Sequence, residues 1–334
     1  MLIGDVARRS GVSARMLRHY ESLGLLRPTG RTGAGYREYS NADVRRIFHI
    51  ESLRSLGLPL RDVARALDEP GFTPSGLIET LVRQTRERIA AETELLTRLK
   101  RIGAAEPPGW EDVLRIVALL NALASESAGK RQRAALSAAE GGAVPVEALV
   151  EAALSETEPN VAGALRWALA QSGEAALAGL AHGLESPAAE VRRRAVQSVV
   201  EIPDHGATVL LQGALADPDL GVRRCAALAL GARGVADAVP TLTDMIADEA
   251  NDVEAADVLS ALASDPSLAD RIVAGLVGRL GNKAVGPSAR LRLAQALADI
   301  PGSTASRVLA DLSRDEDRAV ALTAAYVLEL RDTR

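Results

Sequence analysis

The sequence is poor in cysteine, with one residue, Cys225, in 334. A single thiol excludes an internal disulfide bond and any metal site built from several cysteines. No hydrophobic run approaches the length of a membrane span, and the N-terminus begins with a folded motif rather than the pattern of a signal peptide. We therefore expect a soluble, cytoplasmic protein without a membrane segment.

Aromatic residues are also scarce, at 2% of the chain, although hydrophobic residues make up 47% and can supply a core. Five aromatic residues lie before residue 75, and only Trp110, Trp167 and Tyr326 follow. The core of the later part of the chain must therefore be filled by alanine and leucine, the composition expected of packed helices.

The chain as a whole has no surplus of positive charge, because its formal net charge is −5. Residues 1–102 nevertheless contain 18 Lys and Arg against 12 Asp and Glu, a net of +6. Residues 103–334 contain 21 against 32, a net of −11. A basic front and an acidic back are typical of a DNA-binding head that carries a body with no affinity for DNA.

Residues 3–39 have the pattern of two short helices followed by a hairpin. The first helix is expected around residues 5–9, Ser10–Val12 form a tight turn, and Ser13 is a natural N-cap for a second helix, Ala14–Ser22. Their apolar seam consists of Leu2, Val6, Val12 and Leu17. Helix, short turn and helix is the helix-turn-helix plan, whose second helix lies in the major groove of DNA.

The chain then extends over residues 25–28, turns at residues 29–35 and returns over residues 36–39, which predicts a wing. The candidate DNA contacts are Arg15, Arg18, His19 and Tyr20 on the second helix and Arg31, Tyr36, Arg37 and Tyr39 on the wing. Of these, we expect Arg18, Tyr20, Tyr36 and Arg37 to contact phosphates. Arg15 and His19 are best placed to meet base edges.

The first part of the chain, to about Leu67, resembles the DNA-binding domain of the MerR family of winged-helix transcription regulators. The matching residues are Ile3–Ala7, Gly11–Ser13, Arg18–Glu21, Gly24–Leu26, Arg31, Gly35–Tyr39, Asp43–Val44 and Leu56–Leu58. His19 is a departure, because the family usually has an aromatic residue there. The resemblance implies a dimer that binds promoter DNA with an over-long spacer and distorts it, so that RNA polymerase reads both promoter elements.

Two helices are expected after the wing. The first starts at residues 40–43, ends at Gly57 and has an apolar face of Val44, Ile47, Phe48, Ile50, Leu53 and Leu56. The second runs from Leu60 to Leu67, with Pro59 in its first turn. Pro70, Gly71 and Pro74 then break the pattern.

A long amphipathic helix is expected from Ser75 to Ile102. Val82, Ile89 and Leu96 repeat every seven residues. The companion positions are Ile78, Thr85, Glu92 and Leu99, of which Thr85 and Glu92 are polar. Such a helix could pack on its own domain. The resemblance instead implies an antiparallel coiled-coil dimer, and we favour the dimer because two heads read a two-fold operator.

Beyond a linker at residues 103–109, the sequence becomes repetitive. Val161, Val191, Val222 and Val253 are separated by 30, 31 and 31 residues, and each begins a helix rich in alanine and leucine after a proline or acidic turn. Two helices in a period of about thirty residues predict an α-solenoid. The pattern resembles short HEAT-like repeats, with about six to seven helix pairs and a stretched spacing at residues 281–288.

Two sets of residues in this region invite a functional reading. The arginines at 192–194, 223 and 224 form either a ladder with acids of neighbouring repeats or, less favoured, a ligand site. Trp110 and Trp167 either fill gaps in the core or line a ligand-binding surface. We see no grouping for catalysis, no metal site and no cofactor signature.

These observations predict a mainly α protein with three parts: a winged helix-turn-helix at residues 1–70, a dimerisation helix at 75–102 and a HEAT-like solenoid at 110–334. They favour a homodimeric regulator that distorts promoter DNA when the solenoid binds a small molecule or protein. A DNA-tethered scaffold without an effector is the alternative, and because some HEAT-like repeats occur in pigment-attaching lyases, an enzyme is a remote third. The effector, the operator and the sign of regulation stay open.

Overall fold

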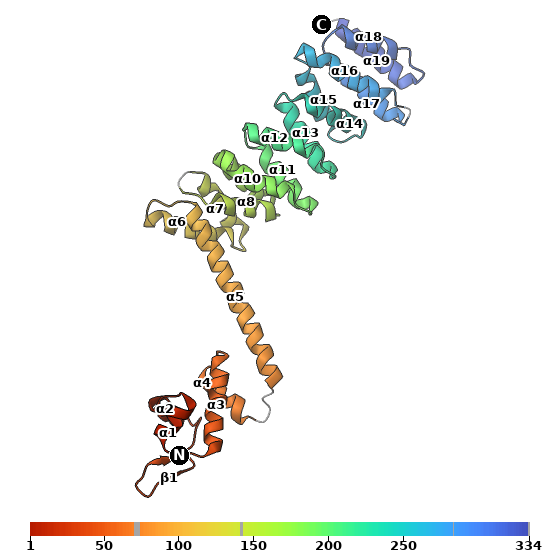
Figure 1. The fold of residues 1–334 in the computed structure, drawn as a ribbon. Helices are drawn as coiled ribbons and strands as arrows, with labels where there is room; N and C mark the ends of the chain where they lie inside the picture. The colour runs from red at the N-terminus through yellow and green to blue at the C-terminus, as the bar shows by residue number, and fades with distance from the viewer. Residues whose placement is uncertain (70–73, 141–142, 283, 333–334) are drawn as a thin grey trace. The chain divides into compact units, whose positions relative to one another are not determined.

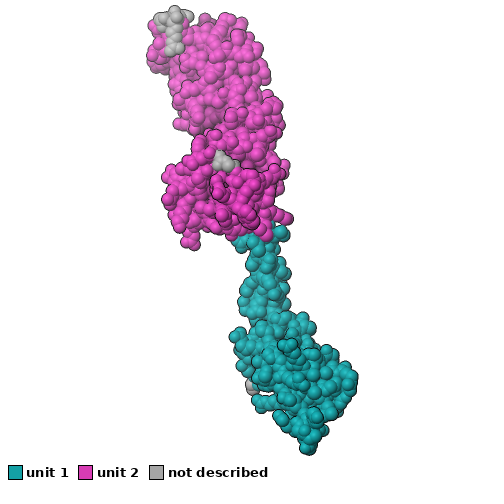
Figure 2. All heavy atoms as spheres, turned by 90° about the vertical axis from the view of Figure 1, so that its left-hand side faces the viewer, with its two compact units in different colours: residues 1–97 teal, residues 98–334 magenta. Residues whose placement is uncertain are grey.

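The computed structural model describes residues 1–69, 74–140, 143–282 and 284–332, and these are mainly helical (Figure 1). The chain divides into two compact units, residues 1–97 and 98–334 (Figure 2). The division falls inside helix α5 (Pro74–Ala104). The finer division into 1–70, 75–102 and 110–334 stays a prediction. In the part of the chain that the structure describes, no helix combines the length and the apolar character that crossing a membrane requires.

The first unit contains the expected helices and wing. Its elements are α1 (Ile3–Ser10), α2 (Ala14–Ser22), β1 (Gly30–Arg31), β2 (Arg37–Glu38), α3 (Asn41–Ser55), α4 (Leu60–Asp68) and the first part of α5. The two strands are antiparallel, with Gly30 opposite Glu38 and Arg31 opposite Arg37. The predicted second helix and its bounds are confirmed, as is the hairpin.

Local signals explain where the helices of this unit begin and end. Ser40 and Asp43 form a reciprocal capping box at the start of α3, in which each side chain accepts a hydrogen bond from the other's backbone N–H. Gly57 follows this helix with a φ of 88°, in the left-handed region that glycine adopts without strain. Pro59 is the N-cap of α4, one residue before the helix, rather than a residue of its first turn.

The apolar face predicted for α3 is too wide. Val44, Ile47 and Ile50 are buried in the core of the unit, whereas Phe48 and Leu56 are largely exposed. Residues three apart lie on one side of a helix, and position 48 is rotated away from that side. The prediction that Phe48 and Leu56 belong to the buried face is therefore wrong for this unit by itself.

Helix α5 covers the predicted span from Ser75 to Ile102 and extends slightly beyond it at both ends. Within the first unit, every residue from 82 to 97 is exposed. The exposed residues include the predicted seam, Val82, Ile89 and Leu96, and Leu99 follows on the next turn with the same exposure. Pro70 and Gly71, which were predicted to break the chain, lie outside the described residues.

The second unit is a stack of helices. After the end of α5 its α-helices are α6 (Trp110–Leu123), α7 (Ala128–Ala139), α8 (Val146–Ser155), α9 (Pro159–Ser172), α10 (Leu177–Leu184), α11 (Ala189–Val200), α12 (His205–Ala214), α13 (Leu220–Ala232), α14 (Val239–Ala247), α15 (Asp252–Leu262), α16 (Pro266–Leu280), α17 (Pro287–Ala296), α18 (Ser303–Leu312) and α19 (Arg318–Asp332). Two short 3₁₀ helices, η1 (Gly173–Ala176) and η2 (Ala236–Ala238), precede α10 and α14. These α-helices form the seven pairs of a HEAT-like solenoid across the described residues, which confirms the predicted fold.

The repeating valines mark equivalent positions in successive pairs. Val161, Val191, Val222 and Val253 each lie within the first three residues of α9, α11, α13 and α15 respectively. The second helices of adjacent pairs contact one another, α7 with α9, α9 with α11, and α11 with α13. Each pair therefore buries its apolar face against its neighbours, as a solenoid requires.

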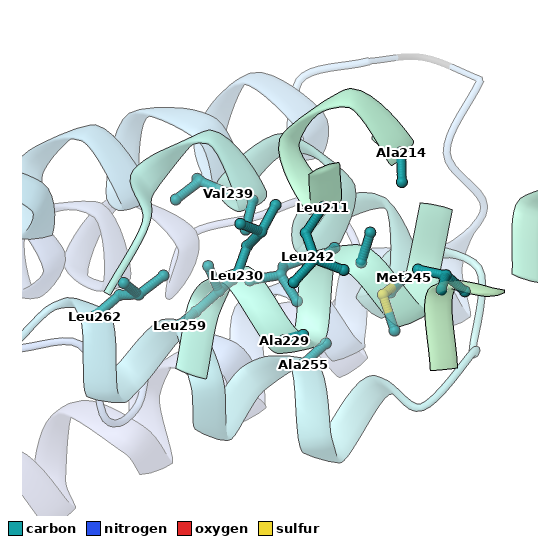
Figure 3. Close-up of a cluster of buried hydrophobic side chains, with 14 of the residues drawn as sticks. Leu211, Ala214, Ala229, Leu230, Val239, Leu242, Met245, Ala255, Leu259 and Leu262 are labelled. Atoms are coloured by element: carbon teal, nitrogen blue, oxygen red, sulfur yellow. The ribbon is translucent and has the colours of Figure 1, made fainter. Parts of the chain in front are cut away.

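The core of this unit is built from small and aliphatic side chains. Leu211, Leu230, Leu242 and Leu259 come from α12, α13, α14 and α15 and gather in one buried cluster (Figure 3). Close helix packing depends on the small residues: a Cβ added at Gly231 would lie 2.2 Å from Val258 Cγ1. The low aromatic content thus corresponds to a core filled by leucine, valine and alanine.

Candidate nucleic-acid interface

The second helix of the first unit presents one polar face to solvent. Ser13 Oγ accepts a hydrogen bond from the Met16 N–H at 3.2 Å and caps the helix. Gly11, with a φ of 75°, allows the tight turn that precedes it. Leu17 and Tyr20 point into the core three residues apart, so Arg15, Arg18 and His19 on the opposite face are exposed. This is the face that a recognition helix uses to enter the major groove.

The three arginines of α2 and β1 have no partner among the described residues. Arg15 and Arg18 on α2 and Arg31 on β1 are exposed and form no hydrogen bond or ion pair with the rest of the described chain. An unneutralised guanidinium attracts phosphate and can donate two parallel hydrogen bonds to it. Their charge is thus available to an external anion.

A single carboxylate links α2 to the wing. Glu21 accepts a hydrogen bond from Arg37 Nε at 2.5 Å with one oxygen and a hydrogen bond from the Tyr39 hydroxyl with the other. Burial first, and then the hydrogen bond to Glu21, raises the pKa of Tyr39. Because Glu21 is on the recognition helix and its two partners are on the wing, the two elements are held in a fixed relation.

A cleft lies between these elements. It has a volume of about 360 Å³ and is lined by residues 2–5, Arg18, Gly35, Tyr36 and Arg37. The side chain of Tyr36 is largely exposed at the wing. Two guanidinium groups and a phenol line this cleft beside one acid, Asp5, which is paired with Arg8. Arg37 is held by Glu21, so Arg18 is the guanidinium free to bind a phosphate of the nucleic-acid backbone. This geometry brings together three of the four residues for which phosphate contacts were predicted.

Tyr20 and Tyr39 are corrections to the predicted set of DNA contacts, because both side chains are buried. The Tyr20 hydroxyl donates to Glu51 Oε1 at 2.5 Å and accepts from Arg54 Nη1 at 2.5 Å. Burial is the main cause of the raised pKa of Tyr20. These two tyrosines support the surface that carries the exposed arginines and are not part of that surface.

Glu21 is the residue of this region that sequence reasoning missed. It belongs to the quoted run from Arg18 to Glu21, but no role was assigned to it. In the sequence, Glu21 directly follows the basic residues Arg18 and His19 of a helix, and the second arm of the hairpin contains an arginine and a tyrosine. This pattern could have indicated that Glu21 binds the wing. The structure shows that Glu21 positions Arg37 and Tyr39.

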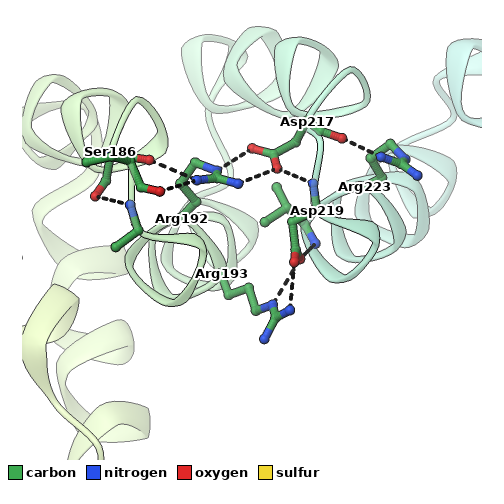
Figure 4. A network of polar contacts seen from close by, with 9 residues as sticks. Ser186, Arg192, Arg193, Asp217, Asp219 and Arg223 are labelled. Carbon is green, nitrogen blue, oxygen red and sulfur yellow. Dashed lines mark hydrogen bonds and ion pairs between the residues drawn. The ribbon is translucent and has the colours of Figure 1, made fainter.

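The arginines of the solenoid are arranged differently. Arg192 binds both carboxylate oxygens of Asp217, at 2.8 and 3.1 Å, and Arg193 binds both of Asp219, at 2.9 and 2.6 Å (Figure 4). Arg224 Nη2 lies 3.5 Å from Asp248. These pairs join α11 to the turn before α13, and α13 to the turn after α14. The predicted ladder between repeats is confirmed for Arg192, Arg193 and Arg224, whereas Arg194 and Arg223 donate instead to the backbone carbonyls of Leu154 and Asp217.

Two further pairs of this arginine ladder, which we call its rungs, were not predicted. Arg131 binds both oxygens of Glu156, at 2.7 and 3.0 Å, and Arg290 forms an ion pair with Asp315. In each case the partners are 25 residues apart, the same separation as Arg192 and Asp217. Searching the sequence for an arginine followed by an acid at that interval would have found them.

The two tryptophans of the solenoid do not fill core gaps. Trp110 is 82% exposed and Trp167 is 46% exposed, so that alternative is wrong, most clearly for Trp110. The solenoid has one cavity between α6 and α7 and another between α13 and α15, and neither tryptophan lines them. A ligand-binding role for Trp110 and Trp167 stays a prediction. Within the described ranges, no cluster of three or more His, Cys, Asp or Glu side chains could hold a metal ion.

Comparison with known families places two regions of the chain. Residues 1–70 match the model of the MerR HTH family regulatory proteins, and residues 177–263 match the model of HEAT repeats. The chain is 42% identical over 97 residues to the HTH-type transcriptional regulator SkgA of Caulobacter vibrioides, covering 29% of this chain and 36% of SkgA. It is 39% identical over 109 residues to the HTH-type transcriptional activator TipA of Streptomyces coelicolor, covering 33% and 40%.

A solved structure of MtaN, the N-terminus of the multidrug transporter activator of Bacillus subtilis, is also similar. It is 32% identical, has a TM-score of 0.30, and the match covers 30% of this chain and 95% of that one. The chain spans 36–40% of the length of SkgA and TipA. These relatives are named as transcription regulators rather than enzymes. The chain therefore has the N-terminal region of a MerR-family helix-turn-helix regulator, joined through α5 to C-terminal HEAT repeats.

Proposed function

We propose that this protein is a dimeric, MerR-type DNA-binding transcription regulator whose HEAT-like solenoid binds a ligand or a protein partner and thereby controls promoter distortion. The observation that carries the proposal is the set of unpartnered cations on α2 and β1, held beside a cleft of about 360 Å³ that Arg18 and Arg37 line. Relatives that match this region are named as regulators and activators of transcription.

In this proposal the recognition helix contacts both bases and phosphates, and the wing contacts phosphates. Arg15 and His19 face the base edges, while Arg18, Tyr36 and Arg37 hold phosphates at the flank of the groove. Contacts from two such heads supply the free energy that bends or untwists the promoter between them. RNA polymerase is the partner that reads the distorted promoter.

The test of DNA binding is footprinting of Arg15→Ala and Arg18→Ala proteins on a randomised operator. Arg18→Ala should weaken binding to every sequence by about tenfold and reduce its salt dependence, because one phosphate contact is lost. Arg15→Ala should relax the preference at particular base pairs. If both variants lose affinity uniformly, Arg15 does not read bases.

The exposed seam of α5 supports the dimer. Val82, Ile89 and Leu96 are exposed at successive heptad positions of a helix whose residues 82–97 have no cover within their own unit. A stripe of aliphatic side chains in water is unfavourable, by about 25 cal/mol for each Å² left exposed. Pairing with the same helix of a second chain buries the stripe.

Replacing Val82, Ile89 and Leu96 together by glutamate tests this interface. Sedimentation should show monomers, and operator affinity should fall at least about a hundredfold, because the second linked head no longer contributes. Gln84→Glu with Ala91→Glu, on the other side of the same helix, is the matched control and should leave a dimer. A triple variant that stays dimeric would place the interface elsewhere.

A DNA-tethered scaffold is the second candidate function. The exposed Trp110 and Trp167 and the extended, repeated surface of the solenoid suit a protein partner as well as a small molecule. A thermal-shift screen and a pulldown, both with the full chain, separate the two. Stabilisation by a small molecule supports the sensor, whereas a protein partner without any small-molecule effect supports the scaffold.

A further inference from the structure

The largest of the cavities described in the solenoid lies at its first helix pair. Its volume is about 810 Å³, and its walls come from α6, α7, Glu140, Ala143 and Val144. This volume is within the range of pockets that hold small organic ligands. Neither tryptophan nor any rung of the arginine ladder contributes to the walls.

Small residues on the two facing helices account for the space. Ala118 and Ala122 lie four residues apart on α6, and Ala134 and Ala138 lie four residues apart on α7. Residues at this spacing share a helix face, so each helix turns a strip of methyl groups toward the cavity. Ile116 is buried beneath them. The lining is therefore apolar at depth and wide enough to accept a hydrophobic body.

The rim of the cavity is cationic. Lys130 and Arg133 are exposed on α7 and form no ion pair within the described residues, and a third cation, Arg115, is paired with Asp112 at 3.1 Å. Glu140 is the one acid among the lining residues. This sign is opposite to that of residues 103–334, whose net charge is −11.

A second cavity in the same unit makes the contrast plain. The cavity of about 530 Å³ beside α13 and α15 has three acids in its lining, Glu254, Asp257 and Asp265, and no basic residue. These two cavities thus differ in charge, and the one between α6 and α7 has unpaired cations above an apolar floor. A third cavity, of about 460 Å³, is mixed, because Asp244 in its lining pairs with Arg279 while Arg271 has no ion pair among the described residues.

We propose that the cavity between α6 and α7 binds a small amphipathic organic anion. Its hydrocarbon part lies on the alanines and Ile116, and its carboxylate or sulfonate is held by Lys130 and Arg133. Burial of the apolar part gives the affinity, and the charge-assisted hydrogen bonds select an anion over a neutral molecule.

The position of the cavity connects it to the dimerisation helix. Asn121, on the helix that forms one wall, accepts a hydrogen bond at 2.7 Å from Arg98 Nη2 near the end of α5. Arg101, one turn later, forms an ion pair with Glu151 on α8. A ligand that moves α6 relative to α7 therefore acts directly on the end of α5. This regulatory part rests on the proposed function, whereas the binding part does not.

The test is calorimetric titration of the full chain with sodium decanoate, without DNA. The wild type should bind saturably, and Lys130→Glu with Arg133→Glu should weaken binding by about tenfold or more. Ala122→Leu should also weaken it, because leucine occupies the space while the cations remain. Arg307→Glu and Ala325→Leu, at exposed positions of α18 and α19, are the matched controls and should bind as the wild type does.

Equal decanoate binding by the wild type and all cavity variants would overturn the site, as would binding of decanol with the same affinity. Binding of an acidic helical peptide without binding of decanoate would overturn the small-molecule assignment. Operator affinity measured with and without decanoate tests the coupling separately. If decanoate binds saturably but operator affinity does not change, only the proposed coupling through Asn121 and Arg98 is overturned. If the wild type binds no DNA, only the proposed function is overturned.

Discussion

Two sets of arginines in this molecule, one from each unit, have different roles. On α2 and β1, Arg15, Arg18 and Arg31 stand exposed without a carboxylate partner in the described chain. In the solenoid, Arg192 and Arg193 each bind both oxygens of an aspartate in the next repeat. The guanidinium groups on α2 and β1 can donate hydrogen bonds to an external anion. Those of Arg192 and Arg193 already donate to carboxylates of the protein.

The role of a charged residue depends on what lies opposite to it. A run such as Arg192–Arg194 has the appearance of a basic patch in the sequence, yet the turn acids of the neighbouring repeat neutralise most of it. The net charge of +6 for residues 1–102 and of −11 for residues 103–334 indicates a similar division more coarsely. Three predictions, in order of decreasing effect, test this distinction.

The largest effect is expected from removing the free arginines. Arg15, Arg18 and Arg31 changed together to glutamine should lower operator affinity at least about a hundredfold while leaving the melting temperature close to that of the wild type. The matched solenoid variant, with Arg192, Arg193 and Arg224 changed to glutamine, should show the reverse. Gel-shift titration and thermal unfolding measure both. Equal loss of DNA affinity in the two variants would abolish the distinction.

A smaller effect, on stability, is expected from breaking single rungs. The side chains of Arg192 and Asp217 are 11% and 8% exposed, whereas those of Arg224 and Asp248 are 30% and 48% exposed. Asp217→Ala leaves a poorly solvated guanidinium without its partner and should lower the melting temperature by several degrees. Asp248→Ala should change it little, because the exposed pair is screened by water. A larger loss for Asp248→Ala would contradict this ranking.

The smallest effect is a response to acid. The hydrogen bond from Arg193, followed by those from backbone N–H groups, holds the pKa of Asp219 well below its usual range. A carboxylate with a lowered pKa stabilises the fold above its unfolded pKa of about 3.9 and loses that contribution as the pH falls further. Thermal unfolding between about pH 5 and pH 2 should therefore show declining stability. Asp219→Asn should flatten the decline, and an unchanged slope would exclude Asp219 as a source.

Much of the fold follows from local sequence. Ser13 and Gly11 determine the start of α2, and Ser40 with Asp43 determines the start of α3, because caps and turns involve residues close together in the chain. The valines repeating at about thirty residues predicted the solenoid for the same reason, since each repeat is a local unit. The arginine ladder was also predictable, as its partners lie close to 25 residues apart.

The sequence by itself therefore determined the helices, the repeat and the division of charge in this protein. Only the tertiary structure decided which side chains of the first unit are buried: Tyr20 and Tyr39 are in the core, and Phe48 is outside it. It also decided that Glu21 joins the recognition helix to the wing, and that alanines of α6 and α7 leave a cavity rimmed by Lys130 and Arg133. These features depend on how separate elements pack against each other, and that packing is fixed by contacts between residues distant in the chain rather than by any local pattern.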